Sequence, residues 1–264
     1  MLNLLRQRPW AAAMLALAAA FSVLATSCAG GGRRTALIPL QIEGAAFVGN
    51  DACRDCHAEQ FRTYDASPHA RVHFDHHRLP GGTSCESCHG PGSRHVEAPW
   101  NRAGLIINPG KKPEACFTCH LEQGAQFRMP SHHPVLEGRM GCVDCHDPHG
   151  AAIFKPARGL AMAQLNEPCL HCHREQQHVF VFEHEAMREG CVQCHHPHGS
   201  INRQLLTERD ANLCLKCHAQ VQGGPGAIII GRTDHTSFLR QGTCWSAGCH
   251  TAVHGSSFNP KLLY

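Results

Sequence analysis

The sequence has little of the material that usually builds a protein core. Aromatic residues make up 6% of the 264 residues, and no long apolar run follows the first 24 residues. The formal net charge is only +3, and the basic residues are scattered, so the charge does not indicate a nucleic-acid partner. A chain with so few core-forming residues needs another source of buried apolar surface.

Cysteine and histidine, in contrast, are abundant, with 17 and 23 residues. Sixteen cysteines lie in eight motifs, seven of the form C-x-x-C-H and one of the form C-x-x-x-x-C-H. C-x-x-C-H is the attachment signature of c-type haem: the thiols bond to the porphyrin vinyl groups and the histidine becomes an axial iron ligand. The sequence therefore predicts eight covalent haem c groups, attached at Cys53, Cys56, Cys85, Cys88, Cys116, Cys119, Cys142, Cys145, Cys169, Cys172, Cys191, Cys194, Cys214, Cys217, Cys244 and Cys249.

Zinc sites and disulfide frameworks are the alternative interpretation of so many cysteines. Zinc sites do use pairs of C-x-x-C units, but they do not require a histidine after every second cysteine. That position is histidine in all eight motifs, although under a tenth of the residues are histidine. Haem attachment is therefore favoured. The predicted proximal iron ligands are His57, His89, His120, His146, His173, His195, His218 and His250.

The motifs recur with a regular spacing. Successive first cysteines are separated by 32, 31, 26, 27, 22, 23 and 30 residues. Taken in pairs, these spacings give a unit of roughly 50 residues used four times. Residues 51–264 are thus predicted to form an octahaem cytochrome c domain of four two-haem repeats. The segments between motifs are short and rich in Pro, Gly and His. This predicts short α-helices and loops wrapped around a chain of haems, with little or no β-sheet.

The odd-numbered motifs carry helix-start signals. These signals are Asn50 or Asp51 before the first motif, Pro113-Glu114 before the third, Asn166-Glu167-Pro168 before the fifth and Asp210 before the seventh.

Residues 1–27 are predicted to be an export signal peptide of the lipoprotein type. Arg6 and Arg8 precede an apolar segment that is too short for a confident transmembrane helix. Leu24 to Cys28 resembles a bacterial lipobox, so Cys28 is the predicted lipidation site. Ordinary cleavage nearby and an uncleaved anchor remain alternatives. Residues 28–50 are predicted to be a tether. The predicted location is the periplasm, with lipid anchoring to the outer membrane, because c-type haem is attached outside the cytoplasm.

Fifteen histidines remain after the proximal ligands are assigned, and several recur at similar offsets from the motifs. Some directly follow the second motif of a repeat, as in Pro148-His149-Gly150, and others lie seven to nine residues before a motif. The predicted distal ligands are His69, His95, His133, His149, His184, His198, His235 and His254, with His76 or His77 as alternatives to His69. We interpret His73, His132, His171, His178 and His196 as surface or supporting residues.

The reach of the chain limits which iron each distal histidine can bind. Two histidines on opposite faces of one iron need Cα atoms roughly 12 Å apart, whereas three residues span at most about 11 Å. His149 is three residues from His146, and His198 is three residues from His195. We therefore expect these histidines to bind neighbouring irons, which would tie successive haems together.

Methionine, the other common axial ligand, does not recur at a fixed offset, so bis-histidine ligation and low potentials are expected. The favoured function is electron transfer and not catalysis. A multihaem reductase of the nitrite, hydroxylamine or tetrathionate type is the alternative, and it would need one iron with an open position. The haem at Cys244 and Cys249 is the candidate for such an iron because of its longer loop. A subunit of an extracellular cytochrome filament is a further alternative.

The motifs together resemble those of the MtrA/DmsE-type multihaem cytochromes. The resemblance is carried by Cys85-Glu-Ser-Cys-His-Gly-Pro-Gly with His95, by the two C-x-x-C-H-x-P-H-G runs, and by Val253-His254-Gly255-Ser256 near the end. It implies an electron conduit associated with an outer-membrane β-barrel porin, with other multihaem cytochromes and a periplasmic electron donor or acceptor as partners. That family has ten haems, whereas this chain has eight motifs.

Overall fold

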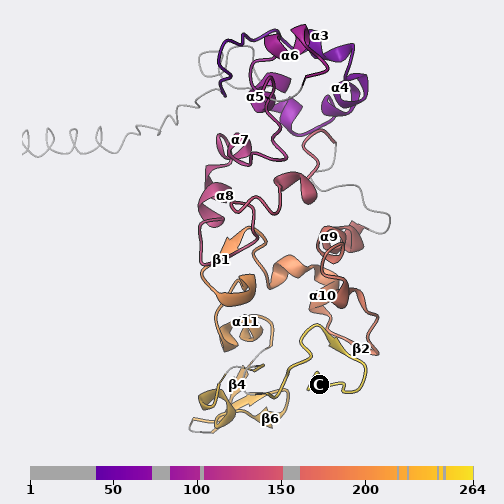
Figure 1. Cartoon of the computed structure of the whole chain (residues 1–264). Helices are drawn as coiled ribbons and strands as arrows, with labels where there is room; N and C mark the ends of the chain where they lie inside the picture. Colours follow the sequence, from indigo (N-terminus) through magenta and orange to yellow (C-terminus); the bar gives the residue numbers. More distant parts are fainter. Residues whose placement is uncertain are drawn as a thin grey trace, which may run out of the picture. The chain divides into compact units, whose positions relative to one another are not determined.

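The computed structural model describes residues 40–72, 84–101, 104–150, 161–218, 220–224, 226–242, 244–245 and 248–263. All of them belong to one compact unit, Ile38–Tyr264 (Figure 1). The predicted signal peptide 1–27, the lipidation site Cys28, the first part of the tether 28–50, and His73, His76 and His77 lie outside the described residues. Those features therefore stay predictions.

The helices are short, and the longest described one has ten residues. The α-helices are α3 (Asp51–Arg54), α4 (Ala58–Tyr64), α5 (Cys85–His89), α6 (Ser93–Glu97), α7 (Glu114–Phe117), α8 (Leu121–Gln126), α9 (Ala161–Leu170), α10 (Ala186–Glu189) and α11 (Ala211–Leu215). The 3-10 helices are η1 (His69–Arg71), η2 (Cys142–Asp144), η3 (Arg174–Gln177), η4 (Cys191–Gln193), η5 (Arg203–Leu205) and η6 (Phe238–Arg240). Within the described ranges, none of the helices has the length and apolar character needed to cross a membrane.

The strands are two or three residues long and form three small antiparallel sheets. β1 (Ser131–His132) pairs with β3 (Gly199–Ser200), and β2 (Phe182–Glu183) pairs with β7 (Gly255–Ser256). The third sheet has the order β4-β5-β6, from Gln220–Gln222, Ile228–Ile230 and Thr233–Asp234. This combination of short helices, long loops and minimal sheet is the one that the sequence predicts.

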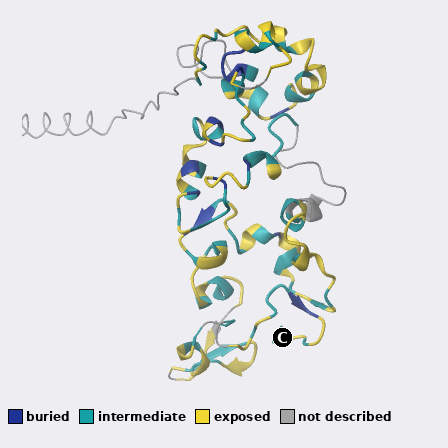
Figure 2. Cartoon of the chain, viewed as in Figure 1, coloured by how far each residue is buried: buried dark blue, intermediate teal, exposed yellow. Residues whose placement is uncertain are grey.

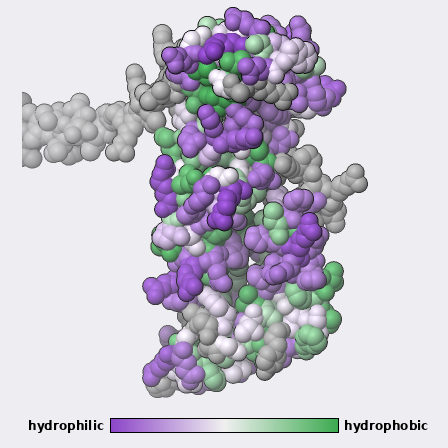
Figure 3. Space-filling model, viewed as in Figure 1, coloured by the Kyte–Doolittle hydropathy of each residue, from purple (hydrophilic) through white to green (hydrophobic). Residues whose placement is uncertain are grey.

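Apolar side chains form little core of their own. The buried ones among the described residues are Leu105, Ala115, Phe127 and Val135. Figure 2 shows the buried residues as separate small patches, and Figure 3 shows hydrophobic residues interspersed among hydrophilic ones on the face in view. Large apolar side chains such as Val179 are exposed when only the polypeptide is present to cover them. The apolar surface buried by the polypeptide alone is therefore small for a chain of this length.

The first motif of each repeat lies on an α-helix, as predicted. Cys53, Cys116, Cys169 and Cys214 are in α3, α7, α9 and α11. Asn50, Pro113 and Asp210 occupy the N-cap positions of α3, α7 and α11. The predicted start at Asn166–Pro168 is wrong, because α9 begins at Ala161 and continues through Pro168. Pro168 lies two residues before Leu170, the last residue of α9, and it has no backbone N–H to donate to the carbonyl of residue 164.

Candidate haem sites

The attachment motifs fold into one recurring tight turn. In this turn the backbone N–H of the motif histidine donates to the carbonyl of the first cysteine, at 2.9–3.0 Å. The bond joins His57 to Cys53, His120 to Cys116, His146 to Cys142, His173 to Cys169, His195 to Cys191 and His218 to Cys214. The second motif, Cys85–His89, is itself the helix α5. A helical turn places both thiols and the histidine on one side, where they can reach one porphyrin.

The eighth motif reaches the same geometry with two more residues. The backbone N–H of His250 donates to the carbonyl of Cys244 at 2.9 Å, although six positions separate the two residues. Gly248, which has φ +75°, adopts the left-handed conformation within this loop. Cys244, Cys249 and His250 therefore form a turn closed by the same bond as the other motifs, and they fit a covalently attached haem.

Within each predicted repeat, the first cysteines of the two motifs are in contact. Their thiols form hydrogen bonds, which join Cys53 to Cys85, Cys116 to Cys142, Cys169 to Cys191 and Cys214 to Cys244. Burial, together with the contact with Cys85, raises the pKa of Cys53 to about 11. These sulfur atoms stand for the thioether sulfurs of the haem-loaded protein. Two porphyrins attached there would have adjacent edges.

Electrostatic interactions between thiols also link one repeat to the next. Burial is the main cause that raises the pKa of Cys88 to about 11, and the nearby Cys119 adds to it. The thiols of Cys145 and Cys169 also interact electrostatically, as do those of Cys194 and Cys217. Together with the hydrogen bonds inside each repeat, these interactions relate the eight motifs to one another in sequence order.

The histidine rings form a series of pairs, each of which joins one motif histidine to one histidine outside the motifs. Seven such pairs have ring centroids 6.0–6.3 Å apart. The pairs are His57 with His95, His69 with His120, His89 with His149, His133 with His173, His146 with His198, His184 with His218, and His195 with His254. Seven of the eight predicted distal ligands are in this set.

This spacing fits an iron held between two imidazoles. Fe–N bonds of about 2 Å put the two ligand nitrogens about 4 Å apart, and each ring centroid lies about 1.1 Å behind its nitrogen, which gives roughly 6.2 Å between centroids. The interplanar angles range from 11° for His89 and His149 to 82° for His69 and His120. Such variation is compatible with axial ligation because each ring can rotate about its own Fe–N bond. The residues present therefore fit haem at these seven positions.

The pairing follows a rule that links different repeats. The histidine that follows the fourth, sixth or eighth motif pairs with the motif histidine two motifs earlier. These pairs are His149 with His89, His198 with His146, and His254 with His195. The histidine shortly before the fourth motif pairs with the motif histidine of the fifth, and the one before the sixth pairs with that of the seventh. These pairs are His133 with His173 and His184 with His218. The ring of His149 thus lies beside His89 and not beside His146, the histidine of its own motif.

Two of the small sheets hold four of the predicted distal histidines in place. His133 directly follows β1 and His198 directly precedes β3, with His132 opposite Gly199 in the ladder. His184 and His254 have the equivalent positions beside β2 and β7, with Glu183 opposite Gly255. A side chain at Gly199 would lie 2.0 Å from the carbonyl oxygen of Gln126, and one at Gly255 would overlap Phe180. Glycine therefore permits the close packing that positions these rings.

Hydrogen bonds at Nδ1 orient many of these rings. Nδ1 contacts a backbone carbonyl in His89 (Ile107), His133 (Pro197), His184 (Val253) and His195 (Gln204), and the side-chain oxygen of Gln126 in His198. A proton on Nδ1 leaves Nε2 unprotonated, so that it can bind a metal.

Burial also keeps several of the rings neutral. It is the main cause that lowers the pKa of His89, His198 and His254 below the usual value of histidine. The neighbouring histidine of each pair lowers it further. A neutral imidazole is the form that binds iron.

The eighth motif has no such pair among the described residues. Nδ1 of His250 contacts the carbonyl of Lys261 at 2.7 Å, as expected for an oriented iron ligand. The eighth predicted distal ligand, His235, packs against Phe238 with ring centroids 6.0 Å apart. The structure does not bring His235 and His250 into ring contact, and ligation by His235 stays a prediction.

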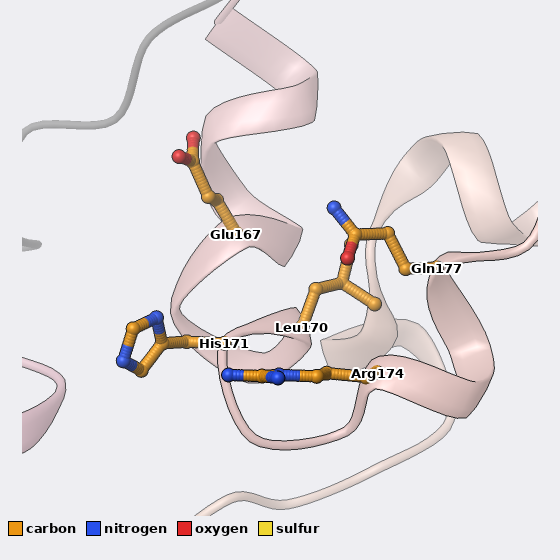
Figure 4. Close-up of a pocket in the computed structure, with 5 residues that line it drawn as sticks. All are labelled: Glu167, Leu170, His171, Arg174 and Gln177. Atoms are coloured by element: carbon orange, nitrogen blue, oxygen red, sulfur yellow. The ribbon is translucent and has the colours of Figure 1, made fainter.

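The remaining described histidines have other neighbours. Both ring nitrogens of His132 are engaged, one with the carbonyl of Met129 and one with Glu137. His171 lies at a small pocket with Glu167 and Arg174 between α9 and η3 (Figure 4). His178 packs against Phe180. None of these rings is in contact with a motif histidine in the part of the chain that is described.

Sequence reasoning missed the contacts through which several residues hold the motifs together. Glu86, inside the second motif, is only 3% exposed and accepts hydrogen bonds from the backbone N–H groups of Val48, Gly49 and Gly92. The side-chain oxygen of Asn50 accepts from the N–H of Cys85 at 2.9 Å. In the third repeat, Asn166 makes the same bond to Cys191 at 2.8 Å.

Comparisons with known proteins agree with this arrangement. The model of a family described as a doubled CXXCH motif matches residues 132–178 and 184–223. A multihaem cytochrome MtrA of Shewanella baltica (strain OS185) is 32% identical over 222 residues, which are 81% of this chain and 60% of that protein. The chain thus matches less than two thirds of the length of this relative.

Proposed function

The chain is a multihaem c-type cytochrome related to MtrA, and from that premise we propose that it carries eight covalent haems and transfers electrons along them. The motif cysteines would hold the porphyrins, and the motif histidines would be the proximal ligands. The haem irons supply the one-electron chemistry, and the polypeptide supplies their ligands, order and surroundings.

The observation that carries this proposal is the set of seven imidazole pairs at 6.0–6.3 Å. An iron with two imidazole ligands has no open coordination position, which suits electron transfer and not substrate chemistry. We therefore assign His69, His95, His133, His149, His184, His198 and His254 as distal ligands. His76 and His77 remain alternatives to His69, because they lie outside the described residues.

The sulfur contacts support a particular order for the haems. Contacts such as Cys53 with Cys85, and Cys88 with Cys119, link consecutive motifs. Electrons would then pass between sequence neighbours, from the haem of the first motif to that of the eighth. The crossed ligation would tie six of the haems to a neighbouring repeat, so that a shift of one repeat would disturb the ligands of another.

The polypeptide would set the protonation and orientation of the ligands. The carbonyl groups of Ile107 and Val253 hold the Nδ1 proton of His89 and His184, which directs Nε2 toward the iron. Burial lowers the pKa of His198, which disfavours the imidazolium form that cannot bind iron.

The location and partners form the second part of the proposal. Export to the periplasm is required for c-type haem attachment, and lipidation of Cys28 would anchor the protein to the outer membrane. The likeness to MtrA supports partners among outer-membrane porins and other multihaem cytochromes, with a periplasmic electron donor or acceptor. A Cys28→Ala variant should move from the membrane fraction to the soluble periplasmic fraction, and an unchanged distribution would refute the anchor.

The test of the haem proposal combines the intact mass of the purified holoprotein with a pyridine haemochrome assay. The expected result is eight haems per chain, at least seven of them low-spin in the oxidised state by electron paramagnetic resonance. Fewer attached haems, or several high-spin irons, would contradict the proposal.

A further inference from the structure

We propose that the buried carboxylate of Glu86 selectively lowers the reduction potentials of two haems, those of the first and second motifs. This inference rests on the proposed function, since it concerns two of the eight haems. It gives an electrostatic role in electron transfer to a residue in a spacer position of its motif, where haem attachment places no requirement.

Glu86 is the one buried charged side chain in the part of the chain that the structure describes. It is 3% exposed, and the other buried polar side chains there belong to serines: Ser67, Ser200 and Ser256. Water screens a buried charge little, and the low dielectric of such a site strengthens its interaction with other charges. A carboxylate in this position can therefore act on a haem several ångströms away.

The hydrogen bonds of Glu86 suit its ionised form. Oε1 accepts from the backbone N–H groups of Val48 and Gly92, at 2.9 and 2.8 Å, and Oε2 accepts from that of Gly49 at 2.8 Å. An ionised carboxylate only accepts hydrogen bonds, whereas a protonated carboxyl also has a proton to donate. Because both oxygens face donors, the site holds a negative charge.

No cation neutralises this carboxylate among the described residues. The ion pairs found there all involve other carboxylates. Arg94, in the nearby helix α6, donates from Nη1 to the carbonyl of Glu43 at 2.9 Å. The backbone N–H groups around Glu86 have partial charges and offset the negative charge only in part.

The charge lies beside sulfur atoms of both haems of the first repeat. Glu86 directly follows Cys85, whose thiol is hydrogen-bonded to that of Cys53. Burial is the main cause that raises the pKa of Cys53 to about 11, and the contact with Cys85 and the charge of Glu86 add to it. Burial also raises the pKa of Cys85, with a smaller contribution from Glu86. One carboxylate thus acts at the attachment points of two porphyrins.

A fixed negative charge disfavours reduction of a nearby haem. One electron converts ferric to ferrous iron and makes the haem more negative by one charge, so a neighbouring carboxylate lowers the potential. In the second repeat, Glu114 and Asp144 interact electrostatically with Cys142, but both side chains are exposed and screened by water. The shift at the first repeat favours electron transfer from that repeat to the third haem.

The test is a redox titration of the full-length holoprotein by absorbance, with the haem content counted on each sample. In Glu86→Gln, two of the eight haems should titrate at higher potential than in wild type, and the other six should be unchanged. Glu86→Asp keeps the charge but not the hydrogen-bond geometry, so it should titrate like wild type. The matched control, Glu114→Gln, removes an exposed carboxylate near Cys142 and should leave the whole curve unchanged.

A second variant tests the charge without removing the carboxylate. The side chain of Val48 is 39% exposed and lies near that of Glu86, since a Cβ at Gly92 would be 3.4 Å from both. Val48→Lys adds a cation there and should raise the same two potentials. Val48→Met adds a long side chain without charge and should not.

The inference is wrong if Glu86→Gln titrates like wild type, or if Glu86→Asp shifts as far as Glu86→Gln. If Glu86→Gln does not attach eight haems, Val48→Lys decides, and a curve like that of Val48→Met refutes the inference. The proposed function fails in a different way, by a haem count below eight or by several high-spin irons in wild type. The two failures are therefore distinguishable in the same samples.

Discussion

Crossed ligation predicts how pairs of histidine substitutions combine. The ring of His149 lies 6.0 Å from that of His89, with an angle of 11° between the planes, although His149 is only three residues from His146. Replacing His149 by alanine should therefore open the iron of the second haem. One iron in eight should therefore lose the low-spin signal that it has in the wild-type protein.

Substitution in two backgrounds identifies which iron is affected. In a His89→Ala background, His149→Ala should add no further high-spin iron, because both residues serve the same haem. In a His146→Ala background, His149→Ala should add one, because the two residues serve different haems. The comparison holds even if the background variant fails to attach one haem, since only the increment caused by His149→Ala is read.

The assay is spin quantitation by electron paramagnetic resonance, with the haem content measured on the same sample. The reasoning would be refuted by the reverse pattern, with an added high-spin iron in the His89→Ala background and none in the His146→Ala background. That pattern would mean that His149 serves the iron of its own motif, against the limit set by the reach of three residues.

Three further predictions concern the residues that support the ligands. Gly199→Ala should cost about 1–3 kcal/mol in unfolding free energy, because the new Cβ would meet the carbonyl oxygen of Gln126 at 2.0 Å. The Gly199→Ala substitution should also perturb the low-spin signal of the haem that His198 would bind. Gly224→Ala, where a new Cβ has open space, should change neither the free energy of unfolding nor that signal. Glu86→Gln should lower the free energy of unfolding in guanidinium by about 1–3 kcal/mol, because an amide nitrogen cannot accept the hydrogen bonds that one carboxylate oxygen accepts. The control is Glu114→Gln, at an exposed position, and equal losses in the two variants would contradict this role of Glu86. A chain produced without haem attachment should show no cooperative unfolding transition by circular dichroism, because the polypeptide alone buries few apolar side chains. A sharp transition would contradict the dependence of folding on haem.

The fold class could be predicted from the sequence, and the candidate attachment motifs could be recognised in it, because covalent haem chemistry fixes local spacing. Two thiols and a histidine must reach one porphyrin, so the motif is contiguous and visible. The short helices and loops follow from the small number of core-forming residues and the short segments between motifs. Even the eighth motif, with its longer loop, closes with the same bond between His250 and Cys244.

The partner of each distal histidine could not be predicted in the same way. The paired rings are 34 to 60 residues apart in the sequence, and loop length alone does not choose between several irons within reach. The reach of the chain excludes that His149 and His198 bind the iron of the motif that each follows, but it does not show which other iron each of them binds. The two-residue strands that hold four of these histidines are also too short to produce an alternating pattern.

Glu86 was missed for a different reason. It occupies a spacer position of its motif, and haem attachment places no requirement on that residue. Its role depends on backbone N–H groups of residues 48, 49 and 92, two of which are more than 35 positions away. The predicted helix start at Asn166 was wrong because Asn166 lies inside α9. Its side chain accepts a hydrogen bond from the N–H of Cys191 and does not cap a helix N-terminus.

The most direct test of the central claim is electron paramagnetic resonance of the oxidised, purified holoprotein, with the haem content counted on the same sample. The account predicts eight haems, of which at least seven are low-spin bis-histidine irons. Several high-spin irons, or fewer than seven low-spin irons, would contradict the assignment of the seven imidazole pairs as iron ligands.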